Sequence, residues 1–592
     1  MTRSTLRPLL ASVVAALALV VAACGGSNSS SGGGGSSSAS SGAANQETGG
    51  GKQGGVLRQL GSSDVDYLDP GHTYYTGGYQ VLYPTQRTLY SFKPDNGKDP
   101  VPDLAASKPQ ISQDLKTITV KIRKGVKFSP PVNREVTSKD VKYAFERFFS
   151  INVGGQYPSY FTSIVGAPSK PTKGVKPISG ITTPDDQTIV FKLSQPLAVS
   201  VSSALVMPIS APVPEEYAKK FDAKNPSTYN THVVATGPYM VKNDASGNLV
   251  GYQAGKSIDL VRNPNWDKST DYRPAYLDEI QMTTNEADAS IAAQQVLTGS
   301  HLTLDANPPA AQLKDVVLNR KGQFVQLPGG GYRYFPLNTT IKPLDNINVR
   351  RAIVAAFDRD AALKARGGKF TGDIPTHFLP PGIPGFEEAG GLKGPGFDFL
   401  KNPRGDMTVA TNYMKKAGYP SGKYTGNAKL LLIAANADPG KAQAEVAKAQ
   451  LEKLGFKITF RTVPQDAVYT EWCQQPKKQV AICGTAGWFK DFTDPESMLE
   501  VTFKGANIVK SGGNNNLAQL DDPKIDAAMD KASTLQGEAR LKAWANIDKM
   551  ITADAPAVPF LWDKTTLIWS KDVQGVGNPY YDGLDFSFTS LK

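Results

Sequence analysis

One aspartate in this chain follows large aromatic side chains at a point where a buried strand is predicted to end. A short apolar run beginning at Val480 has the composition of such a strand. An acid beside aromatic residues at a strand exit suits an apolar-walled cleft in which a carboxylate holds a cationic group. The alternative is an aromatic core residue next to a solvated acid, and these residues alone leave both open. The candidate site residues are Gly487, Trp488, Phe489 and Asp491.

The other polar residues form no recognisable catalytic arrangement. The four histidines show no pair at the helical spacing of zinc ligands, which argues against a zinc hydrolase. Residues 418–422 place a serine one position too late for a nucleophile elbow, and residues 251–257 lack one residue of a phosphate loop. We therefore expect a binding protein without catalytic residues, metal or cofactor. A surface hydrolase is the alternative from another class.

The first 24 residues have the pattern of an export signal. Arg3 and Arg7 precede an apolar, alanine-rich run that is too short for a membrane-spanning helix. Small residues then lead into Cys24, an arrangement that looks like a bacterial lipobox and predicts that this cysteine carries a lipid. The alternative is an ordinary signal peptide with an incidental cysteine. We assign residues 1–24 to a lipoprotein signal peptide.

Residues 25–55 are expected to form a disordered tether, because Gly, Ser, Ala and Asn leave no apolar surface to bury. A random coil of roughly 30 such residues spans about 30 Å. A lipid, a flexible tether and a folded domain in this order predict display on the outer face of the cytoplasmic membrane. The same features are compatible with a Gram-positive-type cell surface.

The chain beyond the tether is long enough for two or three lobes around substantial cores. The formal net charge of the whole sequence is +11, but its lysines are scattered and no basic run alternates with aromatic residues. Nucleic-acid binding is therefore not expected. We expect a monomer, held at the membrane by the lipid on Cys24.

Two cysteines remain once Cys24 is assigned to the lipid. Cys473 and Cys483 lie shortly before the candidate site, and an exported protein meets an oxidising environment, so a disulfide between them is expected. Two free buried thiols are the alternative. A metal site is disfavoured because two sulfur ligands without a neighbouring histidine are incomplete.

Hydrophobic periodicity predicts a mixed α/β protein. Alternating segments predict strands at 117–122 and 188–193, and apolar residues at helical spacing predict helices from Ser138 and around 349–357. A helix at 441–454, a glycine stop and a strand at 456–460 form an α/β crossover unit. Further helices are expected at 523–533 and 536–554, followed by two short strands at 557–562 and 566–569.

Eight short blocks, in order along the chain, resemble the extracytoplasmic solute-binding lipoproteins of ABC importers, in the group that takes up oligopeptides and dipeptides. One departure is Pro-Pro-Val-Asn at 130–133, where the family often has a His-Asp-Gly turn. The blocks include Tyr-Leu-Asp-Pro at 67–70, Val-Thr-Ser-Lys-Asp-Val-Lys-Tyr-Ala-Phe at 136–145, Thr-Gly-Pro-Tyr at 236–239, Arg-Asn-Pro-Asn-Trp at 262–266 and Asn-Val-Arg-Arg-Ala-Ile at 348–353.

The resemblance implies an α/β, two-lobed periplasmic-binding-protein-like fold of the class II type, with mixed sheets linked by crossing strands and an extra subdomain. Lobe I would comprise residues 56–92, 231–338 and 557–592. Residues 93–230 would form the inserted subdomain, and residues 339–556 would form lobe II.

The resemblance also implies a ligand and roles for particular residues. In peptide-binding members, an aspartate soon after a Gly-Trp pair binds the ligand's α-amino group, and Asp491 matches it here. Residues 487–489 would pair with the peptide backbone as in strand addition. A segment of the other lobe would also pair with the peptide backbone, and its residues are Thr76, Gly77, Gly78 and Tyr79.

The implied protein is a receptor that passes oligopeptides to an ABC permease. Members that bind sugars, haem or metal chelates keep the fold, so a non-peptide solute such as an oligosaccharide is the alternative. A sensor of peptide signals would differ only in its downstream partner.

Overall fold

The computed structural model describes residues 46, 48–61, 63–286, 288–305, 307–484, 486–510 and 512–592. The predicted lipid site Cys24 and most of the predicted tether lie outside these residues. The end of that tether is ordered, contrary to expectation. Lys52 forms an isolated antiparallel β-bridge with Leu591, and the Gly54 N–H donates to Tyr276 O at 2.8 Å. These contacts use backbone groups, so they do not need the apolar side chains that the segment lacks.

A six-stranded mixed sheet brings together distant parts of the sequence. Its order is β12-β1-β11-β10-β8, with β9 beside β10. Strand β1 pairs in parallel with β11 and β12, and Val56 lies opposite Glu279. The strands are β1 Val56–Leu60, β8 Tyr239–Val241, β9 Tyr252–Gln253, β10 Ser257–Arg262, β11 Glu279–Thr283 and β12 Leu302–Leu304, and the helices in these stretches are α1 Thr76–Thr85, α5 Ala289–Thr298 and α6 Ala310–Asn319.

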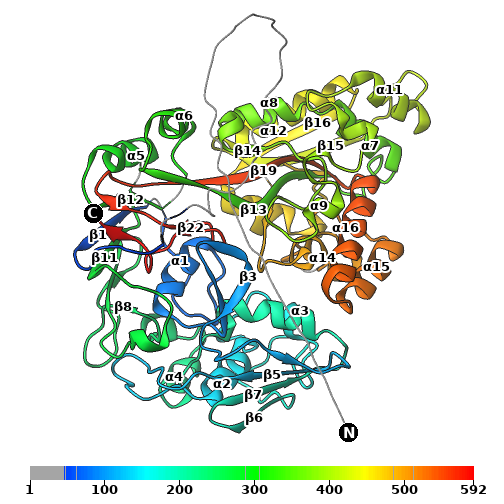
Figure 1. Ribbon diagram of the computed structural model, residues 1–592. Helices are drawn as coiled ribbons and strands as arrows, with labels where there is room; N and C mark the ends of the chain where they lie inside the picture. Colours follow the sequence, from blue (N-terminus) through cyan, green and yellow to red (C-terminus); the bar gives the residue numbers. More distant parts are fainter. Residues whose placement is uncertain are drawn as a thin grey trace, which may run out of the picture. The chain divides into compact units, whose positions relative to one another are not determined.

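Two long antiparallel strands run side by side through the molecule (Figure 1). They are β13 Phe324–Pro336 and β19 Ala557–Ile568, and they occupy the centre of the sheet β14-β19-β13-β18. The expectation of two short strands after residue 556 was wrong. Residues 557–568 form one continuous strand, and its two charged residues pair with neighbouring strands: Asp563 with Arg333 of β13, and Lys564 with Asp373 of β14. The short outer strands are β14 Gly372–Asp373 and β18 Ala486–Phe489.

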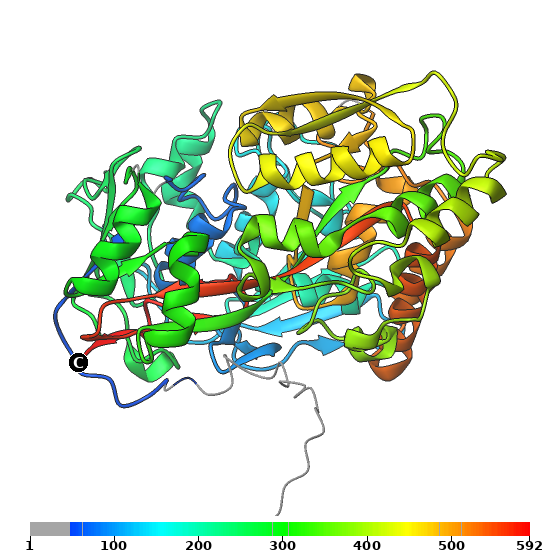
Figure 2. The same ribbon diagram turned by 90° about the horizontal axis from the view of Figure 1, so that it is seen from above.

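The α/β crossover predicted in the C-terminal half is confirmed. Strands β15 Lys429–Ala435 and β16 Lys457–Val463 pair in parallel, and α12 Gly440–Lys453 connects them. Figure 2 shows α12, in yellow, lying along these strands. The third strand of this sheet is β17 Ile482–Cys483. The other helices of eight or more residues in the region are α7 Ile347–Ala356, α8 Arg359–Arg366, α11 Met407–Lys416, α14 Pro495–Phe503, α15 Pro523–Ser533 and α16 Gly537–Asp554. The three helices expected here correspond to α7, α15 and α16. The shorter helices are α9 Phe386–Ala389, α10 Asp398–Lys401 and α13 Gln465–Ala467.

A separate antiparallel sheet, ordered β4-β5-β7-β6, forms between residues 110 and 192. Helix α2 begins at a capping box, in which the side chains of Thr137 and Asp140 bind each other's backbone N–H groups. The strands at 117 and 188 and the helix from Ser138 are confirmed. The elements are β4 Gln110–Ile111, β5 Thr117–Lys121, β6 Ile181–Asp185, β7 Thr188–Lys192, α2 Ser138–Phe148, α3 Ala198–Ser203 and α4 Glu215–Asp222.

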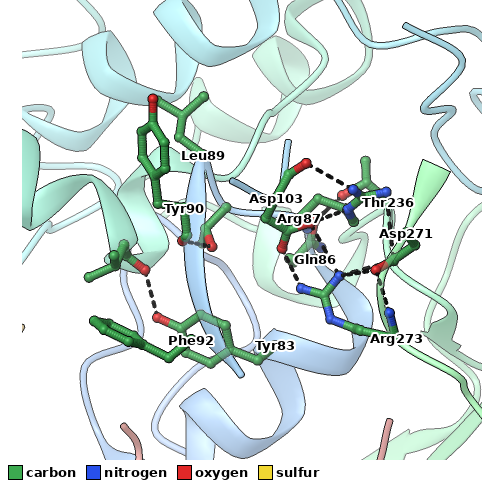
Figure 3. A network of polar contacts seen from close by, with 12 residues as sticks. Tyr83, Gln86, Arg87, Leu89, Tyr90, Phe92, Asp103, Thr236, Asp271 and Arg273 are labelled. Atoms are coloured by element: carbon green, nitrogen blue, oxygen red, sulfur yellow. Dashed lines mark hydrogen bonds and ion pairs between the residues drawn. The ribbon is translucent and has the colours of Figure 1, made fainter. Parts of the chain in front are cut away.

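Buried ion pairs connect the end of the β2–β3 hairpin to the six-stranded sheet region. Asp103 receives hydrogen bonds from both Arg87 and Arg273, and Arg273 Nη1 lies 3.0 Å from Asp271 Oδ2 (Figure 3). Asp103 follows the hairpin of β2 Tyr90–Lys93 and β3 Asn96–Pro102. All four side chains are at most 3% exposed, so each charge depends on its partners for compensation.

Within the part of the chain that the structure describes, no helix has the length and apolar character required to cross a membrane.

Candidate functional site

A cavity of about 590 Å³ lies where β18 meets the start of α1, in the size range of ligand pockets. All eight residues expected from the sequence line it: Thr76, Gly77, Gly78, Tyr79, Gly487, Trp488, Phe489 and Asp491. The tertiary structure thus brings together two segments that are more than 400 residues apart.

Strand β18 is an edge strand of the sheet β14-β19-β13-β18, since β13 is the only strand among the described residues that pairs with it. The sequence suggested that the buried strand after Val480 continues directly to the aromatic residues, and this was wrong. The chain leaves the three-stranded parallel sheet after Cys483, at the end of β17. It enters the sheet β14-β19-β13-β18 at Ala486, where β18 begins. One edge of β18 therefore stays open for a further strand.

Asp491 is buried and held by tyrosine hydroxyls. Tyr74 OH donates to its Oδ1 at 2.8 Å, and Tyr160 OH donates to its Oδ2. Tyr580 OH donates to its main-chain oxygen at 2.8 Å. Only 6% of Asp491 is exposed, and no lysine or arginine among the described residues forms an ion pair with it. Its negative charge thus has neutral donors but no compensating cation.

Burial raises the pKa of Asp491 to about 6, because removal from water disfavours the ionised form. The hydrogen bonds from Tyr160 and Tyr74 oppose this effect by stabilising the carboxylate. Burial also raises the pKa values of both tyrosines well above their ordinary value, so they remain donors at neutral pH. A bound cation would therefore stabilise the ionised form of the Asp491 carboxylate.

The segment from Thr76 to Tyr79 is helical, which corrects the expectation that it pairs with a ligand as an extended strand. It forms the first turn of α1, and the Tyr79 N–H donates to Tyr75 O at 3.0 Å. Asp66 fixes the entry into the helix by accepting from the backbone N–H groups of Tyr74 and Tyr75. A helical turn lacks the alternating backbone groups that a strand ladder requires.

Lys490 and Asp582 form a charged pair in the cavity wall. Lys490 Nζ lies 3.9 Å from Asp582 Oδ2, which is an ion pair beyond hydrogen-bond range. The Oδ1 atom of Asp582 is buried and has no hydrogen-bond partner among the described residues. Burial raises the pKa of Asp582 to about 7 and lowers the pKa of Lys490.

The residues around Asp491 also have structural roles. Trp488 is partly exposed to the cavity, and its Nε1 donates to Ser497 O at 2.8 Å. Asp494 caps the N-terminus of α14, with Pro495 as the first helical residue, and its carboxylate binds Arg540. Asp494 and Pro495 therefore start a helix.

Cys473 and Cys483 form a disulfide with Cα atoms 6.0 Å apart. It joins a π-helical turn at Val468–Cys473 to β17, shortly before β18. No group of three or more His, Cys, Asp or Glu side chains suited to a metal occurs in the described ranges.

The sequence did not indicate several residues that complete the cavity. Tyr160 and Tyr580 lie in segments with no local motif, and only the fold brings them to Asp491. Tyr74 lies two residues before the expected segment, which begins at Thr76, so its closeness in the sequence was a usable signal. The missed residues with a polar or charged group at the site include Asp64, Asp66, Tyr74, Asp305, Arg333, Lys490, Tyr580 and Asp582 in the cavity lining, and Tyr160 beside Asp491.

Comparison with known proteins identifies the family. The family model of bacterial extracellular solute-binding proteins, family 5 (middle region), matches residues 99–510. The chain therefore belongs to this family, which consists of solute-binding proteins rather than enzymes, and the resemblance seen in the sequence is confirmed. The expected α/β fold of periplasmic binding proteins is confirmed as well.

Individual relatives are moderately similar over most of their length. Heme-binding protein A of Haemophilus influenzae is 26% identical over 82% of this chain and 82% of its own. The oligopeptide-binding protein OppA of Bacillus subtilis is 24% identical over 80% of this chain and 82% of its own. Among solved structures, clavulanic acid biosynthesis oligopeptide binding protein 2 has a TM-score of 0.79 and 25% identity, covering 93% of this chain and 98% of that chain.

Proposed function

From its membership of solute-binding protein family 5, we propose that this protein is an extracellular receptor for oligopeptides. The peptide binds in the cavity between β18 and α1. Its α-amino group lies at Asp491, and its backbone pairs with the open edge of β18. The protein then delivers the peptide to an ABC permease.

The observation that carries this proposal is the uncompensated charge of Asp491. A buried carboxylate with hydrogen bonds only from neutral hydroxyls is costly, because no cation offsets its lost hydration. An ammonium group placed against it would supply the missing charge through a charge-assisted hydrogen bond. The N-terminus of a peptide is such a group.

The open edge of β18 supports a peptide over other cationic solutes. An added strand makes hydrogen bonds through its backbone, so its side chains can vary without loss of these contacts. Trp488 and Phe489 line the cavity on the same strand and offer apolar surface to ligand side chains. Relatives named as oligopeptide- and dipeptide-binding proteins are in accord with this choice.

The cellular setting is also part of the proposal. The lipobox at Cys24 would anchor the mature protein to the outer face of the cytoplasmic membrane, and the Gly/Ser-rich tether would let it reach the permease. We also propose that lobe I comprises residues 56–92, 231–338 and 557–592, that lobe II comprises residues 339–556, and that residues 93–230 form the inserted subdomain. This choice is supported because the six-stranded, three-stranded and β4–β7 sheets each fall within one of these parts. We expect the protein to act as a monomer.

The first test is native mass spectrometry of the exported protein, purified without a refolding step. We expect a series of bound masses that match mixed short peptides. A single non-peptide mass, such as that of an oligosaccharide, would retain the receptor role and remove the amino-group role of Asp491. A cavity that remains empty against a peptide library would contradict the peptide proposal.

A further inference from the structure

A short hairpin near the C-terminus carries part of the cavity wall in its turn. Its strands are β21 Gly577–Asn578 and β22 Gly583–Leu584, and β22 lies beside α1 (Figure 1). The side chains of the turn that line the cavity are Tyr580, Tyr581 and Asp582. Strands of two residues are too short to hold a hairpin in place by themselves, so its position depends on the groups that bind its edges.

Glutamine side chains bind both edges of this hairpin. Gln46, in the predicted tether, binds the two backbone groups of Gly577. The Gly577 N–H donates to Gln46 Oε1 at 2.6 Å, and Gln46 Nε2 donates to Gly577 O at 2.9 Å. On the opposite edge, Gln80 Nε2 donates to Leu584 O at 3.2 Å. Gly577 is buried, so its backbone groups need these hydrogen bonds in place of water.

Gln46 also joins this hairpin to a neighbouring one. Its Nε2 atom donates to Pro94 O at 3.3 Å, in the turn between β2 and β3. Phe92 of β2 packs against Tyr580, with the two ring centroids 4.7 Å apart. Gln46 therefore binds at the junction of two hairpins that meet at the Tyr580 ring.

Tyr580 connects this junction to the ligand site. Its hydroxyl donates to the main-chain oxygen of Asp491 at 2.8 Å. A Cβ atom added at Gly577 would lie 2.9 Å from the side chains of two leucines, one on β13 and one on β19, so the hairpin rests on these central strands. Packing fixes that face of the hairpin, and Gln46 fixes its edge. A shift of this edge would move Tyr580 relative to Asp491.

We propose that Gln46 is a positioning residue for peptide binding: it joins the end of the tether to the hairpin β21–β22 and thereby holds Tyr580 against Asp491. This inference rests on the proposed function, since it assumes that the peptide binds in this cavity. The tether then has a second role besides connecting the domain to the membrane. Its docked end supports the wall of the binding site.

The test measures the affinity of trialanine by isothermal titration calorimetry with the exported protein. Gln46→Ala should weaken binding about three- to tenfold, because the edge of the hairpin loses its hydrogen bonds. The matched control is Gln53→Ala. Gln53 is the same residue type in the same segment, but its Oε1 accepts from Arg262 Nη2, away from the hairpin, at 3.1 Å. This variant should keep the wild-type affinity.

A double-mutant cycle separates positioning from a general loss of stability. Tyr580→Phe keeps the ring and removes the hydroxyl that binds Asp491. If Gln46 acts through that hydroxyl, Gln46→Ala should weaken binding less than about twofold in the Tyr580→Phe protein. A full three- to tenfold loss in that protein overturns the proposal. An unchanged affinity of Gln46→Ala in the otherwise wild-type protein also overturns it.

Hydrogen–deuterium exchange of residues 577–584 in the ligand-free protein provides a readout that needs no peptide. Exchange should be faster in Gln46→Ala than in the wild type, and it should be unchanged in Gln53→Ala. Equal exchange in Gln46→Ala and the wild type overturns the contact on which the proposal depends. If no peptide binds the wild type, the proposed function is overturned, and the exchange rates still decide whether Gln46 holds the hairpin.

Discussion

Tyr74 and Asp491 are joined by a hydrogen bond of 2.8 Å, although 417 residues separate them in the sequence. Tyr160 binds the other carboxylate oxygen from a third segment of the chain. Phe492, the next residue after Asp491, packs edge-to-face against the Tyr160 ring. The carboxylate is therefore positioned by parts of the protein that meet only in the folded state, and its properties give the first three predictions.

Replacing Asp491 with asparagine should weaken peptide binding at least about thirtyfold. The substitution keeps the shape of the side chain but removes the charge that pairs with the ligand's ammonium. Calorimetric titration with a free tripeptide measures the effect. Asp95→Asn is the matched control, because Asp95 is exposed and lies outside the cavity lining. An affinity of Asp491→Asn within threefold of the wild type would contradict the assigned role.

The stability of the ligand-free protein should depend on pH through Asp491. Its pKa is raised from 3.8 to about 6 in the fold, so between these values the folded protein holds a proton that the unfolded chain has lost. This contribution to the free energy of unfolding is present below about pH 4 and decreases by roughly 3 kcal/mol as pH rises through 6. Urea unfolding of the wild type and Asp491→Asn between pH 4 and 7 measures it. Parallel pH profiles would count against the raised pKa.

Peptide affinity should fall as pH is lowered through 6. Only the ionised form of Asp491 attracts an ammonium group, so protonation competes with the ligand, and Kd should rise about tenfold per pH unit below that value. Titrations at several pH values between 4.5 and 8 test this. Because Asp582 also has a raised pKa, near 7, Asp582→Asn serves as a parallel variant that should keep the decline below pH 6.

Removing the charge of Asp103 should destabilise the fold by about 3–5 kcal/mol. Asp103 is fully buried and compensates Arg87 and Arg273, so Asp103→Asn leaves two guanidinium groups with only Asp271 as an anionic partner. Chemical unfolding monitored by tryptophan fluorescence gives the change. The control is Asp99→Asn on the adjacent hairpin, where the side chain is exposed. Similar stabilities of the two variants would refute the expected cost.

Loss of the disulfide should lower the free energy of unfolding by about 3 kcal/mol, since the bond closes a short loop of the unfolded chain. The double substitution Cys473→Ser and Cys483→Ser provides the comparison. A reducing agent should bring the wild type to the stability of this variant and leave the variant unchanged. If reduction has no effect on the wild type, the two thiols are not joined in the purified protein.

The sequence by itself determined the local elements and the family. Helix α2, the crossover unit of β15, α12 and β16, and the late helices α15 and α16 follow from periodicity and caps, which act over a few residues. The ordered motifs identified a solute-binding protein and pointed to Asp491. The register and length of the strands were harder to predict from the sequence. Strand β19 continues through Asp563 and Lys564 because their charges are neutralised by Arg333 and Asp373, which are far away in the chain.

The tertiary structure alone decided what surrounds Asp491. Hydrogen bonds from Tyr74 and Tyr160, the open edge of β18 and the ion pair of Arg333 with Asp563 depend on contacts between residues more than a hundred positions apart. The helical form of Thr76–Tyr79 likewise depends on Asp66, which binds backbone N–H groups just before the helix. Local pattern reports which residues prefer burial or a given backbone shape. Charge balance and cavity walls arise only when distant segments pack and exclude water from between them.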